Sequence, residues 1–117
     1  MKPSNPLLRR STVTLEKAGR KQKAPIWTTA SAMLSSPSRT RVEVNVGRIS
    51  RIAKDGEAIF VPGKVLAGGV LEGKIIVGAF AFSMEARSKI EASGGKALSV
   101  DEFLKKYPDG SGVKLVR

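Results

Sequence analysis

The longest apolar run of the chain is IIVGAFAF, residues 75–82. Eight residues cannot cross a bilayer as a helix, but a continuous apolar run of this length fits a β-strand that is buried on both faces. We therefore expect Phe80, within this run, to lie in the core. Ser83 can cap a helix directly after the strand, and Gly94-Gly95 can end that helix. A buried strand that passes into a helix favours the α/β fold class.

Further strands are predicted on both sides of this run, from alternating or short apolar stretches. The Pro62-Gly63 pair should halt the strand before it, because proline lacks the N–H that a ladder needs. Residues 62–74 are then expected to form a glycine-rich loop with room for a short strand. In addition to residues 75–82, strands are expected over residues 41–46, 58–61 and 113–116.

Helices are predicted from capping residues, prolines and a 3.6-residue apolar spacing. Asn45 should cap a short helix that buries Ile49 and Ile52. Ser99 and Glu102 form the capping-box pattern at the start of another helix. Helices are expected from Pro6 to within residues 19–23, from Pro25 to residue 35, over residues 46–53, after Ser83, and from residue 100 to residue 106.

The charge is concentrated in the first half of the chain. The 117 residues carry a net charge of +11, and residues 1–54 hold 12 of the 21 Lys and Arg with only two acidic residues. We expect one globular protein of 12.5 kDa, in which a basic, mainly helical N-terminal region (1–40) packs on an α/β core (41–117). An excess of this size in so small a protein indicates a polyanionic partner.

Cysteine and histidine are absent from the sequence. This excludes disulfides, Cys/His zinc sites and a Ser-His-Asp triad, and it argues against an enzyme. We also expect no metal, no cofactor and no small-molecule substrate. No secretory signal or membrane-spanning stretch is evident, which predicts an intracellular protein without a membrane anchor. Trp27 lies on the apolar face of the second helix and is expected to pack in the core.

One segment imitates a nucleotide-binding loop. Residues 68–74, GGVLEGK, match the GxxxxGK pattern. The next residue is Ile75, where a P-loop needs Ser or Thr to bind magnesium, and the segment opens a strand where a P-loop opens a helix. A small enzyme built on this loop is therefore the less favoured alternative.

The basic residues of the first half are the candidate ligands for phosphate. Arg and Lys neutralise phosphates, and the Ser and Thr residues between them can add hydrogen bonds. Arg48 and Arg51, three apart on a helix, should share one face. The candidate residues are Arg9, Arg10, Arg20, Lys21, Lys23, Arg39, Arg41, Arg48, Arg51, Lys54 and Lys64.

Several motifs together resemble one protein family. They are VNV at 44–46, FVPGKVL at 60–66, GGVL at 68–71, AFAFS at 79–83 with Ala86, Lys89 and Ile90, Gly94-Gly95, and PDG at 108–110. In this order they are similar to the archaeal and eukaryotic large-ribosomal-subunit family called "L eighteen e", which is related to the bacterial family "L fifteen". The length of the chain resembles that of archaeal members.

The resemblance implies an irregular β-β-α superhelical core and a structural role in the cytoplasmic ribosome. Its implied partners are large-subunit rRNA and neighbouring large-subunit proteins. The family's basic N-terminal region and its VPGKVL loop lie near rRNA, which adds Lys2 and Gly63 to the candidate rRNA-binding residues. The alternative is a free basic DNA-binding or chromatin-like protein, although no helix-turn-helix or similar module is evident.

Overall fold

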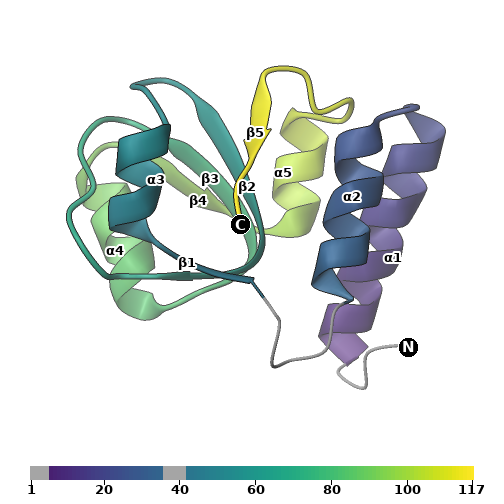
Figure 1. Cartoon of the computed structure of the whole chain (residues 1–117), viewed down its shortest axis with the longest axis horizontal. Coiled ribbons are helices and arrows are strands. Elements are labelled where there is room, and N and C mark those ends of the chain that lie inside the picture. Colours follow the sequence, from purple (N-terminus) through teal and green to yellow (C-terminus); the bar gives the residue numbers. More distant parts are fainter. Residues whose placement is uncertain (1–5, 36–41) are drawn as a thin grey trace.

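A computed structural model of the chain describes residues 6–35 and 42–117 (Figure 1). It is a mixed α/β fold, as predicted. The helices are α1 (Pro6–Lys21), α2 (Pro25–Leu34), α3 (Val46–Ile52), α4 (Met84–Ala92) and α5 (Val100–Lys106). The strands are β1 (Val42–Asn45), β2 (Ala58–Leu66), β3 (Ile76–Phe82), β4 (Lys96–Leu98) and β5 (Val113–Leu115).

All five strands lie in one parallel sheet centred on β2. One edge of β2 pairs with β3, which in turn pairs with β4. The other edge of β2 is shared by two strands, with β5 beside residues 58–60 and β1 beside residues 63–66. The carboxyl ends of β1, β2 and β3 therefore meet at one edge of the sheet, and the segments that follow them lie close together there.

The prediction that Pro62-Gly63 ends the second strand is wrong, because β2 runs on to Leu66. The register between β2 and β3 shifts between Val61 and Lys64, and such a bulge accommodates a proline without a ladder N–H. Gly63 is buried, and a Cβ there would collide with the carbonyl of Val42. Glycine at this position lets β1 approach β2.

Helices cover both faces of the sheet, and each face has its own apolar cluster. Along β2, Ile59 and Val61 join the cluster under α3 and α4, whereas Ala58 and Phe60 join the cluster under α1, α2 and α5. Figure 1 shows α3 and α4 on one side of the sheet and the other three helices on the opposite side. Alternate residues of one strand thus hold together two layers of helices.

Trp27 connects the N-terminal helices to the rest of the core, as predicted. It is fully buried and meets Phe60 and Phe103 edge-on, with ring centroids 5.2 and 5.8 Å apart. Its indole N–H donates a hydrogen bond to the carbonyl of Pro108 at 3.0 Å. Gly19 lets α1 and α2 pack closely, since a Cβ there would meet Thr28.

The predicted caps are confirmed at two helices and wrong at a third. The Ser83 hydroxyl accepts the Ala86 N–H at 3.1 Å, and Ser99 and Glu102 form both bonds of the capping box. Asn45 occupies the N-cap position of α3 but makes no capping bond with its side chain. Its Oδ1 instead accepts the N–H of Gly68 at 2.9 Å, because the loop after β2 lies beside it.

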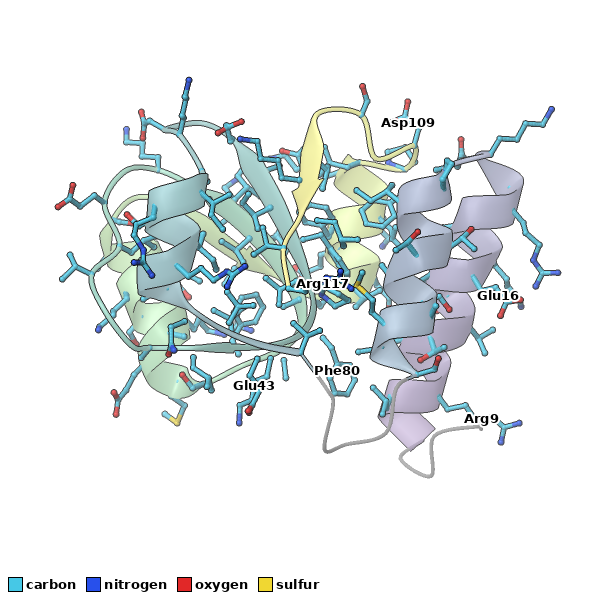
Figure 2. The ribbon with its side chains drawn as sticks, viewed as in Figure 1. Arg9, Glu16, Glu43, Phe80, Asp109 and Arg117 are labelled. Carbon is cyan, nitrogen blue, oxygen red and sulfur yellow. The ribbon has the colours of Figure 1, made fainter. Side chains whose placement is uncertain are left out.

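Two predicted core residues are more exposed than expected, and one strand was not anticipated. Ile52, the last residue of α3, is 37% exposed. Phe80 is only half-buried and lies at the lower border of the core in Figure 2. Three-residue β4 has no periodicity of its own and forms by pairing with β3.

None of the described helices is long and apolar enough to cross a membrane.

Candidate nucleic-acid interface

The described candidate residues of the first half lie on two surfaces. The α1 surface, on α1 and the turn after it, consists of Arg9, Arg10, Arg20, Lys21 and Lys23. The α3 surface, on α3 and just after it, consists of Arg48, Arg51 and Lys54. Figure 1 shows α1 and α3 toward opposite ends of the molecule, whose longest extent is 35 Å. A ligand that contacts both surfaces must therefore extend across the protein.

The α1 surface is exposed and only partly neutralised. Arg20 Nη2 lies 2.8 Å from Glu16 Oε1, and Arg10 Nη2 lies 3.9 Å from Asp101 Oδ2. Exposed pairs of this kind contribute little to stability and can be exchanged for phosphate contacts. The other three residues of this surface form no ion pair within residues 6–35 and 42–117. Figure 2 shows Arg9 pointing away from the body of the protein.

The α3 surface carries two exposed arginine side chains on one short helix. Arg48 and Arg51 are exposed and three residues apart on α3, so they share one face as predicted. Neither side chain has a hydrogen bond or an ion pair with another described residue. At Lys54 it is the backbone N–H that has a partner, because it donates to Glu57 Oε1 at 2.5 Å. This hydrogen bond, with one from Lys114, lowers the pKa of Glu57.

The remaining candidates divide into surface, buried and undescribed positions. Lys64 is exposed on β2, beside Glu43 in the register of β1. Gly63 is buried against Val42, so its observed contacts belong to strand packing. Lys2, Arg39 and Arg41 lie outside the described residues.

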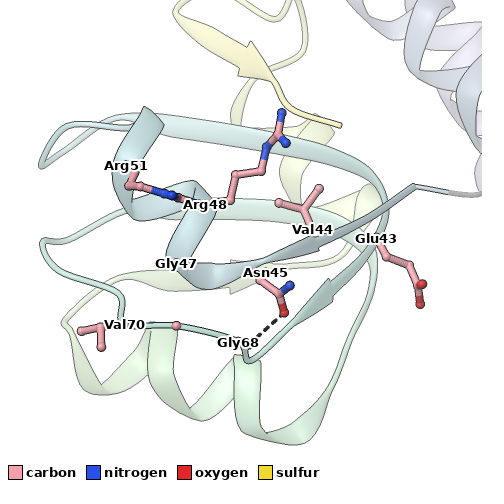
Figure 3. A pocket seen from close by; sticks show the side chains of 9 residues that line it. Glu43, Val44, Asn45, Gly47, Arg48, Arg51, Gly68 and Val70 are labelled. Atoms are coloured by element: carbon pink, nitrogen blue, oxygen red, sulfur yellow. Dashed lines mark hydrogen bonds between the residues drawn. The ribbon is translucent and has the colours of Figure 1, made fainter.

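A pocket of about 740 Å³ adjoins the α3 surface (Figure 3). It lies where the carboxyl end of β1 and the start of α3 face the loop after β2. Arg48 and Arg51 line one part of it, and Val70, on the facing loop, is 71% exposed. Its lining residues are Glu43, Val44, Asn45, Gly47, Arg48, Arg51, Gly68, Gly69 and Val70.

The glycine-lined part of this pocket is backbone held in place by hydrogen bonds. The Gly47 N–H donates to the Gly68 carbonyl at 2.9 Å, and a Cβ on Gly69 would lie 2.8 Å from the Gly47 Cα. From the other side, Lys89 Nζ donates to the carbonyls of Ala67 and Gly69 at 2.6 and 2.8 Å. The glycine cluster was the available sequence signal for this wall, but nothing in the spacing indicated which segment it would face.

The segment that imitates a P-loop has no phosphate-cradling geometry. Residues 68–74 lead into β3, as predicted, and no helix follows them directly. The backbone N–H of Lys74 is directed at the Asp55 carboxylate. No group of three or more potential metal ligands occurs among the residues that the structure describes.

Comparison with known proteins gives one consistent family. The family described as ribosomal proteins 50S-L15 and 50S-L18e, together with their 60S counterpart, matches residues 43–98. A protein of Pyrobaculum aerophilum named large ribosomal subunit protein eL18 is 46% identical over 97% of this chain and 93% of its own length. Proteins of the same name from Methanopyrus kandleri and Archaeoglobus fulgidus are 41% and 40% identical, over 97% and 99% of this chain and 94% and 99% of their own lengths.

Proposed function

The chain belongs to the family of large ribosomal subunit proteins named eL18, and from this premise we propose that it is a structural constituent of the large ribosomal subunit. Its partners are then large-subunit rRNA and neighbouring large-subunit proteins, and its place is the cytoplasmic ribosome. The family name implies a structural role and no enzyme activity. The chain contributes folded mass and positive charge to an RNA assembly.

The observation that carries this proposal is the surplus of unpaired positive charge on two separate surfaces. Arg9, Lys21 and Lys23 on the α1 surface, and Arg48 and Arg51 on the α3 surface, have no ion-pair partner in the part of the chain that the structure describes. Their mutual repulsion is relieved when phosphates replace the counterions around them. Because the two surfaces are far apart, the protein can bridge two rRNA segments whose phosphates would otherwise repel each other.

Contacts to phosphates position a protein on RNA without reading sequence. The sequence supplies no aromatic platform for the single-strand readout used by other RNA-binding folds. Four of the six aromatic side chains, Trp27, Phe60, Phe103 and Tyr107, pack on one another around the buried indole. Recognition on the α1 surface is thus expected to follow shape and phosphate position.

The test is sedimentation of a tagged chain in a cell lysate over a sucrose gradient at several salt concentrations. We expect the chain to travel with the large subunit at low salt and to leave it only at high salt. A variant with Arg9, Lys21 and Lys23 changed to Ala should leave at lower salt. Sedimentation with DNA, or a chain that stays at the top of the gradient at every salt concentration, would contradict the proposal.

A further inference from the structure

We propose that the pocket between α3 and the loop after β2 holds a single unpaired nucleotide of RNA, with its phosphate on Arg48 and Arg51 and its ribose and base against residues 68–70. This inference rests on the proposed function, because it names what part of the RNA the α3 surface takes. The pocket is a hollow open to solvent, and its volume of about 740 Å³ leaves room for one nucleotide. A duplex backbone needs only a flat or convex basic surface.

The two parts of the pocket differ in charge, as the phosphate of a nucleotide differs from its ribose and base. One part carries two guanidinium groups that have no partner among the described side chains, and guanidinium groups bind phosphate through paired N–H donors. The facing loop is uncharged, because two of its residues are glycines and the third is Val70, which is 71% exposed. An exposed valine beside bare backbone gives an apolar surface for the ribose or the face of a base.

The pocket also offers groups that suit a base edge. Within the described residues, neither the Gly69 N–H nor the Val70 N–H has a hydrogen-bond partner. The amide nitrogen of Asn45 is not used by the bond that Asn45 Oδ1 accepts from Gly68. Glu43 lines the end of the pocket away from Val70 in Figure 3 and forms no ion pair with a described residue. A carboxylate repels a second phosphate but can accept a hydrogen bond from a base amino group.

The pocket is prepared before any ligand arrives. Asn45 holds the loop from one side through Gly68, and Lys89 holds it from the other through two carbonyls. Gly47 and Gly69 are in backbone contact, so the loop cannot move toward α3 to fill the hollow. A preformed wall lowers the ordering cost of binding, which favours a small ligand such as one nucleotide.

The experiment compares short RNA hairpins that differ only at one position of the stem. One hairpin is fully paired, and four others carry a single unpaired A, C, G or U. Binding to the whole chain is measured by fluorescence anisotropy at about 100 mM salt, where phosphate contacts still contribute strongly. We expect at least one bulged hairpin to bind roughly tenfold more tightly than the paired one, the discrimination typical of one good set of contacts to a base.

Three variants separate the pocket from general electrostatics. Arg48→Ala with Arg51→Ala should bring the ratio of bulged to paired affinity close to one. Arg9→Ala with Lys21→Ala removes the same charge from the α1 surface, so it should weaken binding to all hairpins and keep the ratio. Val70→Ser changes no charge and should lower the ratio roughly threefold through lost apolar contact. All the altered side chains are exposed, and melting curves check that each variant is folded.

The outcomes distinguish the two proposals. If the wild-type chain binds all hairpins equally, the pocket inference is wrong while the proposed function stands. The same conclusion follows if the Arg48/Arg51 and Arg9/Lys21 variants change the ratio alike, or if Val70→Ser leaves it unchanged. If the chain binds none of the hairpins and does not sediment with the large subunit, both proposals fail together.

Discussion

Changing Trp27 to Ala should destabilise the N-terminal helices and the sheet together, as one cooperative unit. Trp27 is fully buried between α2 and the sheet and contacts the Phe60 and Phe103 rings edge-on. Its cluster joins Leu8, Leu15 and Leu34 of the helical hairpin to the residues of β2 and α5. The predicted division into residues 1–40 and 41–117 therefore describes composition, and we propose that the two parts fold as one unit.

The expected loss of unfolding free energy follows from the size of the Trp27 side chain and from the contacts that its removal breaks. Truncation of a buried Trp to Ala costs about 3–5 kcal/mol of unfolding free energy, through lost burial and the cavity that remains. Edge-to-face contacts with two rings contribute to this cost. Trp27→Phe keeps an aromatic ring but leaves the Pro108 carbonyl without its indole donor, which costs about 1 kcal/mol beyond the smaller ring volume. A domain of this size has a total stability of about 5–15 kcal/mol.

The assay is urea unfolding followed by circular dichroism at the helix band, because the substitution removes the sole tryptophan as a fluorophore. With a denaturant slope of about 2 kcal/mol per molar, a loss of about 4 kcal/mol lowers the midpoint by about 2 M. Trp27→Phe should lower it by less than half of that. Thr29→Ala, on the exposed face of the same helix, is the matched control and should not lower the midpoint, because Ala favours a helix more than Thr does.

A biphasic curve for the Trp27→Ala variant would refute this reasoning. If the first transition shifted and the second stayed at the wild-type midpoint, the α1–α2 hairpin would be a separate unit that only rests on the core. A single transition that shifts by less than about 1 kcal/mol would show that the buried indole contributes little.

Three further expectations concern packing, pH and salt. A Cβ on Gly78 would collide with the Phe103 ring, so Gly78→Ala should destabilise the fold by about 1–3 kcal/mol. The same urea assay measures this loss, and an unchanged midpoint would contradict the tight contact. The Ser99 backbone N–H lowers the pKa of Glu102, so the stability that this carboxylate contributes is present above its unfolded pKa and is lost as the pH falls through the lower folded value. Glu102→Gln should make the fall in thermal stability between about pH 5 and pH 3 less steep, and an equally steep decline in that variant would refute the assignment. The logarithm of RNA affinity should fall linearly with the logarithm of salt concentration, and removing Arg9 and Lys21 should reduce the slope by about two units; an unchanged slope would show that they do not contact phosphate.

The elements with strong local signals are the ones that the sequence predicted well. Ser83, Ser99 and Glu102 cap helices through bonds within three residues, so the pattern alone determines the structure. The β2 strand was predicted too short because the bulge that accommodates Pro62 depends on β3, a partner that local patterning cannot identify. Asn45 was predicted to cap α3 with its side chain, because local patterning cannot identify its actual partner, Gly68, which is 23 residues away.

The sequence predicted which residues carry the charge of the candidate site, but it did not predict the pocket beside them. The Arg48 and Arg51 pair followed from helical spacing alone, and the structure confirms that the two share a face. The pocket beside them depends on the close approach of Gly47 and Gly69, which only the parallel arrangement of β1 and β2 creates. Lys89 reaches the same loop from α4, and its spacing in the sequence gave no indication of this role.

The position of β5 has a consequence for the order in which the protein can form during its own synthesis. Residues 113–115 pair with residues 58–60 in the middle of the sheet, and the Val116 N–H donates to the Phe60 carbonyl at 3.0 Å. Until these late residues have been added, one edge of β2 stays open beside Phe60. The cationic first half has by then already been made. In the order of synthesis, the positive charge is therefore available to phosphate groups before β5 can close the edge beside Phe60.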